Sequence, residues 1–300
     1  MRKLTSIRHL SAQDIYGLLD FADQLKVRFH RGLNYKPLTG KTVITSFPPT
    51  SLRTRISYET GINQLGGQSI NLQVEFNDHE ILEDRMKYLN NWVDFLVIRH
   101  PEQELIEKIS NYARFGVVNA MSKKYHPCEI LGDAQSIRER RGELKNLKFV
   151  YVGMASNIGN SWFELAAKLD LNMTQICVPG YEVEKEIFEN AKANSKGDIL
   201  IEHDLEKGID GADIILTDSW MKIDNQEDLA LWEGYRLTLE NLKRANKSCL
   251  VNPCPPFIRG QEISAEVIQS DYFIGYKCKE NLMHIQKAVL SSINNRIIGY

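Results

Sequence analysis

The chain has 300 residues, of which 25% are charged, and its formal net charge is -2. This length suits two domains with separate cores, while the small net charge indicates neither a nucleic-acid nor a membrane-surface partner. The apolar runs are far shorter than the roughly 20 residues that cross a bilayer. Five cysteines, scattered and odd in number, favour reduced thiols in a cytoplasmic protein over a disulfide framework or a zinc site.

The first half of the chain alternates helical and strand patterns. A capped amphipathic helix is predicted behind Ser11, because apolar residues recur there at helical spacing. Strands are then predicted at 43–47, 69–72, 95–98 and 117–119, and helical patterns at 56–65, 80–91 and 102–112. Such alternation is typical of a parallel α/β sheet.

The second half repeats this organisation. A helix over 130–141, closed by Gly142, is expected to bridge the two halves. Further strands are predicted at 148–152, 173–178, 199–202, 214–217 and 248–252, again separated by helical segments. The fold class we predict is therefore α/β, with two doubly wound parallel-sheet domains of similar size. In such domains ligands collect beyond the carboxyl ends of the strands.

A Ser-Leu-Arg-Thr-Arg run that starts at Ser51 lies where a strand turns into a helix. Helix-opening N–H groups and the positive end of the helix dipole favour an anion there. Arg53 can bind two phosphate oxygens in a fork, and the Ser51 and Thr54 hydroxyls can donate to the others. The alternative is that these arginines are solvated or paired, as Arg55 could pair with Glu59 four residues later.

This run resembles the Ser-x-Arg-Thr-Arg motif of the aspartate/ornithine carbamoyltransferases, which binds the phosphate of carbamoyl phosphate. Four further segments resemble the family's motifs, in the family's order. They are Arg-His-Pro at 99–101, His-Pro-Cys-Glu-Ile-Leu-Gly-Asp at 126–133, the turn at 153–161, and Asn-Pro-Cys-Pro-Pro at 252–256. The last two stand where the ornithine branch has a Gly-Asp-Gly-Asn-Asn turn and His-Cys-Leu-Pro, so the chain is closer to that branch. The segment at 252–255 also fits the aspartate branch's His-Pro-Leu-Pro in a second register.

The resemblance implies a carbamoyl phosphate-binding domain over 1–135, on which a C-terminal helix at 281–300 packs back, and an acceptor-binding domain over 136–280. It implies an enzyme that needs neither cofactor nor metal and assembles as a homotrimer or a multiple of one. The expected reaction carries a carbamoyl group to the amine of ornithine, giving citrulline and phosphate, or to an N-acylated ornithine. The alternative is a non-catalytic paralogue that binds a phosphorylated or amino-acid ligand.

The resemblance also implies roles in binding carbamoyl phosphate for Ser51, Leu52, Arg53, Thr54, Arg99, His126 and Glu129. The catalytic set would be Thr54, Arg99, His126 and Cys254, of which the first three would point at the carbonyl oxygen that gains negative charge. Taken alone, a histidine before proline is more often a loop residue. Glu129 stands where the family has glutamine. Its carboxylate can accept from the carbamoyl NH₂, but its charge near a phosphate costs affinity unless an arginine offsets it.

The acceptor would be bound by Asn157, Asp218, Lys222 and Cys254. An aspartate is apt for a cationic amine. Lys222 replaces an uncharged serine of the ornithine branch, and its ammonium would favour an acceptor whose distal end carries negative charge. Each position also has a structural explanation: Asn157 in a turn, Asp218 at a helix cap, Cys254 as apolar filler and Lys222 as a solvated lysine.

Overall fold

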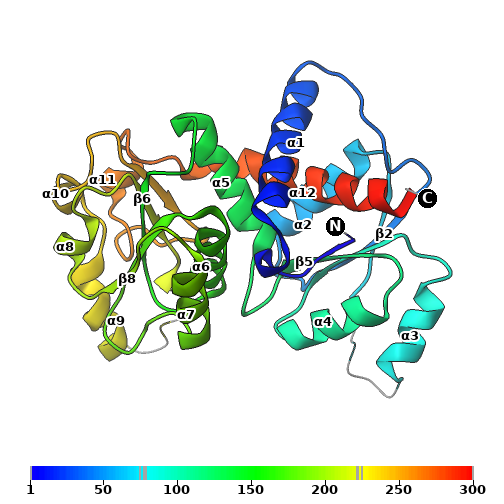
Figure 1. The fold of residues 1–300 in the computed structure, drawn as a ribbon, viewed down its shortest axis with the longest axis horizontal. Coiled ribbons are helices and arrows are strands. Elements are labelled where there is room, and N and C mark those ends of the chain that lie inside the picture. Colours follow the sequence, from blue (N-terminus) through cyan, green and yellow to red (C-terminus); the bar gives the residue numbers. More distant parts are fainter. Residues whose placement is uncertain (1, 74–75, 77–79, 221–222, 224–225, 299–300) are drawn as a thin grey trace. The chain divides into compact units, whose positions relative to one another are not determined.

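The computed structural model describes residues 2–73, 76, 80–220, 223 and 226–298. It divides into two compact units, Met1–Gln135 with Lys279–Tyr300, and Ser136–Cys278. Each unit contains a five-stranded parallel sheet flanked by helices (Figure 1). The predicted fold class, two doubly wound parallel α/β sheets, is confirmed. In the described part of the chain, no helix is both long and apolar enough to cross a membrane.

The sheet of the first unit has the strand order β1-β5-β4-β2-β3, and all four pairings are parallel. Its strands are β1 (Lys3–Leu4), β2 (Thr42–Ser46), β3 (Gln68–Asn71), β4 (Phe95–Arg99) and β5 (Gly116–Met121). The central strands β2, β4 and β5 are buried, whereas every residue of the edge strand β3 is exposed. The two-residue strand β1 was not predicted, because it is too short to show an alternating pattern.

Helices cover both faces of this sheet. They are α1 (Ala12–His30), α2 (Arg53–Gln64), α3 (Leu82–Leu89), α4 (Gln103–Tyr112) and the first part of α5 (Pro127–Arg141), with the short 3-10 helix η1 (Ile7–His9). Ser11 caps α1 in a capping box with Asp14, as its sequence predicts. Residues 279–298 of α12 (Gly275–Ile298) lie beside α1 (Figure 1), where Lys26 pairs with Glu280 at 3.5 Å.

The sheet of the second unit has the order β10-β9-β6-β7-β8, again with parallel pairings throughout. Its strands are β6 (Lys148–Val152), β7 (Asn172–Ile176), β8 (Ile199–Glu202), β9 (Ile214–Thr217) and β10 (Leu250–Pro253). Its helices are α6 (Asn157–Leu169), α7 (Lys185–Asn194), α8 (Leu205–Ile209), α9 (Gln226–Trp232), η3 (Glu233–Tyr235), α10 (Leu239–Leu242) and α11 (Ala265–Ile268). Helices α6 and α7 lie on one face and α8, α10 and α11 on the other (Figure 1).

Element boundaries differ from the predicted ones for local reasons. The helix predicted to begin at residue 130 begins at Pro127, because proline suits the first helical position, where no N–H partner is required. This places His126 directly before the helix. The final helix, expected over 281–300, begins six residues earlier at Gly275, since its first turn shows no apolar periodicity.

Candidate active site

The predicted phosphate-binding residues meet at the carboxyl ends of β2 and β4 in the first unit. Ser51 is 3% exposed and Thr54 is 7% exposed at the start of α2, and Arg99 is the last residue of β4. Arg99 Nη1 donates to Ser51 Oγ at 3.2 Å, although 48 residues separate them. Leu52, at the N-cap of α2, is 64% exposed.

The two arginines of this group repel each other. Burial and the nearby charge of Arg53 lower the pKa of Arg99 below its usual value. In the part of the chain that the structure describes, no carboxylate lies within ion-pair distance of Arg53 or Arg99. Arg55, by contrast, pairs with Glu59 at 2.9 Å, which is the structural alternative considered for this segment. Among the described residues, Arg53 and Arg99 therefore form a cationic pair that bonds no carboxylate directly, although the Arg53 charge also helps to lower the pKa of Glu129. Two cations placed so close together are a typical feature of an anion site.

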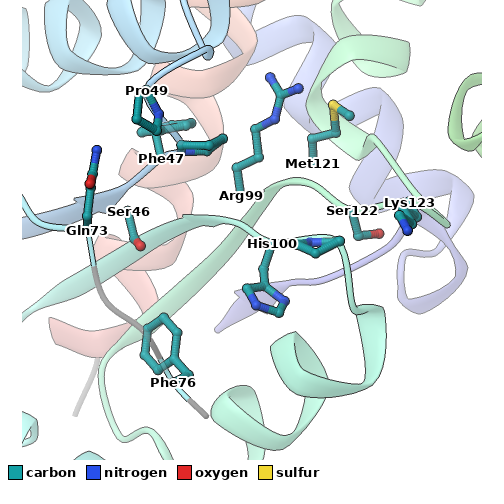
Figure 2. A pocket seen from close by; sticks show the side chains of 12 residues that line it. Ser46, Phe47, Pro49, Gln73, Phe76, Arg99, His100, Met121, Ser122 and Lys123 are labelled. Carbon is teal, nitrogen blue, oxygen red and sulfur yellow. The ribbon is translucent and has the colours of Figure 1, made fainter. Parts of the chain in front are cut away.

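A cavity of about 650 Å³ adjoins this group at the same edge of the sheet. It is lined by Ser46, Phe47, Pro48, Pro49, Gln73, Phe76, Arg99, His100, Pro101, Met121, Ser122 and Lys123. In Figure 2 the Arg99 side chain extends between Pro49 and Met121, whereas His100 points to another part of the cavity. Arg99 therefore both lines this cavity and bonds Ser51.

His126 and Glu129 lie one helical turn apart at the start of α5, and each is 5% exposed. His126 Nε2 is 3.8 Å from Glu129 Oε2. Lys279, at the first-unit end of α12, donates to Glu129 Oε1 and to Asp133 Oδ1, the latter at 2.9 Å. Burial alone would raise the pKa of Glu129, but the charges of Lys279, His126 and Arg53 and the Lys279 hydrogen bond lower it below its ordinary value. The carboxylate is therefore ionised and its charge is offset.

A buried contact fixes α5 against α2. Tyr58 Oη, on α2, donates to Cys128 Sγ on α5 at 3.1 Å. Burial, opposed by the Tyr58 hydrogen bond, raises the pKa of Cys128 to about 12, so this thiol stays neutral. The contact joins the helix that begins with the arginine motif to the helix that begins after His126.

In the second unit, three of the predicted acceptor residues lie beyond adjacent strands. Thr217 is the register partner of both Val152 and Pro253, so β9 lies between β6 and β10. Asp218 and Cys254 follow directly after β9 and β10, on strands about 4.8 Å apart. Asn157 is 3% exposed and opens α6, which Ser156 caps. The fourth residue, Lys222, lies outside the described residues.

The buried Tyr151 holds the turn that precedes Asn157. Tyr151 Oη donates to the Met154 carbonyl at 2.9 Å and lies 2.9 Å from Ser156 Oγ. Its ring lies against the first turn of α6, where a Cβ on Gly159 would come within 2.8 Å of it. Burial and the charge of Asp218 raise its pKa well above the ordinary value. The glycine is thus needed here for a close approach and not for its backbone angle.

Both halves of the chain are similar to known proteins. Residues 2–139 match the carbamoyl phosphate-binding domain of the aspartate/ornithine carbamoyltransferases, and residues 145–293 match the Asp/Orn-binding domain of the same family. The chain belongs to this family. It is 33% identical over 300 residues to the ornithine carbamoyltransferase of Caldicellulosiruptor saccharolyticus, covering 97% of each chain. It is 32% identical to that of Desulfotalea psychrophila, covering 96% of this chain and 97% of the other.

Solved structures of carbamoyltransferases share the fold. The ornithine carbamoyltransferase of Pyrococcus furiosus superposes with a TM-score of 0.93 at 29% identity, covering 96% of each chain. The anabolic enzyme of Campylobacter jejuni gives a TM-score of 0.90 at 27% identity, covering 99% of this chain and all of the other. The recognition of a carbamoyltransferase of the ornithine branch is confirmed, and the non-catalytic alternative is not favoured.

Two residues of this carbamoyltransferase were missed in the sequence. Lys279 lies 150 residues from Glu129, and no motif connects them. Glu262 is 1% exposed, and burial together with the charge of Asp218 raises its pKa to about 7. A lysine and a glutamate on polar stretches carry no local signal of burial, so only the folded chain identifies them.

Proposed function

We propose that this protein transfers the carbamoyl group of carbamoyl phosphate to the amino group of ornithine, giving citrulline and phosphate. One observation carries the proposal: Arg53 and Arg99 stand close to each other without a carboxylate partner among the described residues, next to the buried hydroxyls of Ser51 and Thr54. A phosphate would neutralise both cations and accept from both hydroxyls. Membership of the carbamoyltransferase family supports carbamoyl phosphate as the source of this phosphate.

The proposed mechanism depends on stabilising the negative charge that develops on the carbonyl oxygen during the reaction. The neutral amine attacks the carbonyl carbon, and the carbonyl oxygen becomes an oxyanion that Thr54, Arg99 and His126 stabilise. The bond between the carbonyl carbon and the bridging oxygen then breaks, and phosphate leaves with the electron pair while the amine loses a proton. Arg53 and Arg99 stabilise the leaving phosphate. Positioning and electrostatics supply the catalysis, so no covalent intermediate is required.

Glu129 takes the place of the family's glutamine without placing an uncompensated charge near the phosphate. Its carboxylate accepts from the carbamoyl NH₂, as the glutamine oxygen would. The ammonium of Lys279 supplies the cation that the sequence lacked nearby. Because Lys279 also bonds Asp133, it holds the carboxylates of two successive turns of α5 in place. Lys279 is therefore a positioning residue of the carbamoyl group.

The Asp218 carboxylate is suited to bind the amine of the acceptor, and Asn157 is suited to bind its α-groups. Cys254 follows β10, the strand that pairs with the β9 strand before Asp218. Ornithine is the first acceptor we propose, because the compared relatives are ornithine carbamoyltransferases. An N-acylated ornithine is the second, since the lysine at position 222 would pair with a negatively charged distal group.

A panel of amines tests the function. Phosphate release and ureido-product formation would be measured with ornithine, N-acetylornithine, N-succinylornithine and aspartate, against an amine-free control. We expect equal amounts of citrulline and phosphate, formed fastest with ornithine, and Lys222→Ser to shift preference further toward ornithine. Phosphate release that no amine raises above the control rate would overturn the proposal and favour a ligand-binding paralogue.

We also propose that the protein is a cytoplasmic homotrimer or a multiple of one. Leu52, Ile56, Ile70 and Leu72, on α2 and around the edge strand β3, are between 40% and 64% exposed. An exposed apolar edge strand needs a partner surface. All five cysteines are free, as suits a reducing compartment. Light scattering should give a mass of three times 34.4 kDa, or a multiple of that value.

A further inference from the structure

Three side chains of the second unit bring different metal-ligand types to one place. Cys177 follows β7, Glu182 lies in the loop after it, and His203 follows β8. Their ligand atoms all lie within 4.8 Å of one another. None of the three belongs to the proposed acceptor group, which lies beyond β6, β9 and β10. No ligand spacing in the sequence indicates this group, because its members come from two separate strand ends.

The histidine is oriented as a metal ligand would be. His203 Nδ1 lies 2.9 Å from the Cys177 carbonyl oxygen, to which it donates when it carries the proton. That bond leaves the lone pair on Nε2, which is 3.6 Å from Glu182 Oε1. Tyr235 Oη donates to the His203 carbonyl at 2.6 Å and fixes the backbone. A ring N–H bonded to a carbonyl, with the other nitrogen directed inward, is the usual arrangement of a metal-bound histidine.

The other two ligands are fixed in a similar way. The Gly180 N–H donates to Glu182 Oε1 at 2.9 Å, and Cys177 is fully buried at the edge of an apolar cluster with Trp220 and Trp232. Thus two of the three donors stand at partly exposed positions and the sulfur lies beneath them. Cys177 and Glu182 both lie in the loop after β7, and His203 reaches them from the end of the neighbouring strand β8.

The separation between His203 Nε2 and Glu182 Oε1 matches a tetrahedral ion. Bonds of about 2.0–2.1 Å to nitrogen and oxygen and about 2.3 Å to sulfur place tetrahedral ligand atoms roughly 3.3–3.6 Å apart. The observed 3.6 Å between His203 and Glu182 is at this distance. The widest separation allowed by the 4.8 Å limit exceeds it by about 1.2 Å, which a side-chain rotation closes. A thiolate and a carboxylate also balance the two charges of a divalent ion.

We propose that Cys177, Glu182 and His203 bind a divalent transition-metal ion, best Zn²⁺, with water in the fourth position. The mixture of sulfur, nitrogen and oxygen donors selects zinc over magnesium or calcium, which prefer oxygen ligands alone. On binding, the thiol S–H bond is replaced by an S–Zn bond and the proton passes to solvent. The ion would join the loop after β7 to the end of β8 and stabilise the second unit.

Cobalt(II) provides a direct probe, because a thiolate–Co²⁺ bond gives a charge-transfer band in the near ultraviolet. The whole protein would be stripped with a chelator and titrated with Co²⁺, then with Zn²⁺ in competition. We expect one equivalent of Co²⁺ to develop the band, Zn²⁺ to abolish it, and Zn²⁺ to raise the melting temperature by several degrees. Cys177→Ser should lose both effects, and Cys249→Ser, which removes another buried thiol of the same unit, should keep both.

Two further variants distinguish a loss of metal binding from a folding defect. Glu182→Gln and His203→Gln change partly exposed side chains, and each should weaken Co²⁺ binding at least tenfold while the metal-free melting temperature stays unchanged. A missing charge-transfer band in the parent would overturn the proposal. So would a band that survives Cys177→Ser but disappears in Cys254→Ser, because the ion would then bind at the acceptor group.

Discussion

Replacing Lys279 by methionine is the sharpest test of how the carbamoyl-binding group is held. The change keeps the length of the side chain and removes the ammonium that bonds Glu129 and Asp133. These carboxylates are only 5% and 3% exposed, so the variant leaves buried negative charge without its lysine. Removing one partner of a buried ion pair costs about 3–5 kcal/mol of unfolding free energy. We expect Lys279→Met to lose about that much at pH 8.

The pH dependence should change sign as well. In the parent the pKa of Glu129 is lowered by folding, so its contribution to stability is present above the unfolded pKa and is lost as the pH falls. Burial is already the largest single influence on this pKa, and without the charge and hydrogen bond of Lys279 we expect it to outweigh the charges of His126 and Arg53 and to raise the pKa. The variant should therefore lose stability as the pH rises above about 4.5, where the unfolded glutamate ionises.

Urea denaturation followed by circular dichroism between pH 5 and 8 measures both effects. Lys277→Met is the matched control, because Lys277 lies two residues earlier in α12 and is exposed; its cost should stay within about 0.5 kcal/mol. Glu129→Gln should cost about 1 kcal/mol or less, since Lys279 keeps Asp133 as its partner. If Lys279→Met and Lys277→Met unfolded at the same urea concentration with the same pH profile, Lys279 would not hold Glu129.

Three other changes test the rest of the proposal. Arg53→Ala should weaken carbamoyl phosphate binding by about 2 kcal/mol, roughly 30-fold in Kd, whereas Arg55→Ala should not, because Arg55 already pairs with Glu59; equal losses by calorimetry would contradict the phosphate assignment. His126→Ala should lower turnover about 10²–10³-fold with a smaller change in KM, and an unchanged turnover would remove His126 from the mechanism. Glu262→Gln should raise the stability at pH 8 but not at pH 4, because a folded pKa of about 7, above the unfolded value, costs stability as the pH rises through that window. A melting temperature that shifts equally at both pH values would show that the Glu262 charge is not the cause.

Local patterns in the sequence were enough for most of the architecture. The strands at 148–152 and 214–217 have the boundaries that their sequence predicts, because a short buried strand is a continuous, mostly apolar run between polar turns. The capping box at Ser11 was equally local, since its two hydrogen bonds join residues three positions apart. The carbamoyltransferase motifs could also be recognised in the sequence, because each is a continuous segment of no more than ten residues.

The tertiary structure decided which side chains share a site. Arg99 reaches Ser51 across 48 residues, and Lys279 reaches Glu129 across 150. Neither contact has a signal in the local sequence. The first depends on the pairing and register of the parallel strands, and the second depends on where α12 packs in the first unit. The glutamate at 129 could be recognised from the sequence as a departure from the family. Only the fold shows that a lysine offsets its charge, since the free energy of a buried carboxylate depends on its neighbours in space and not on those in sequence.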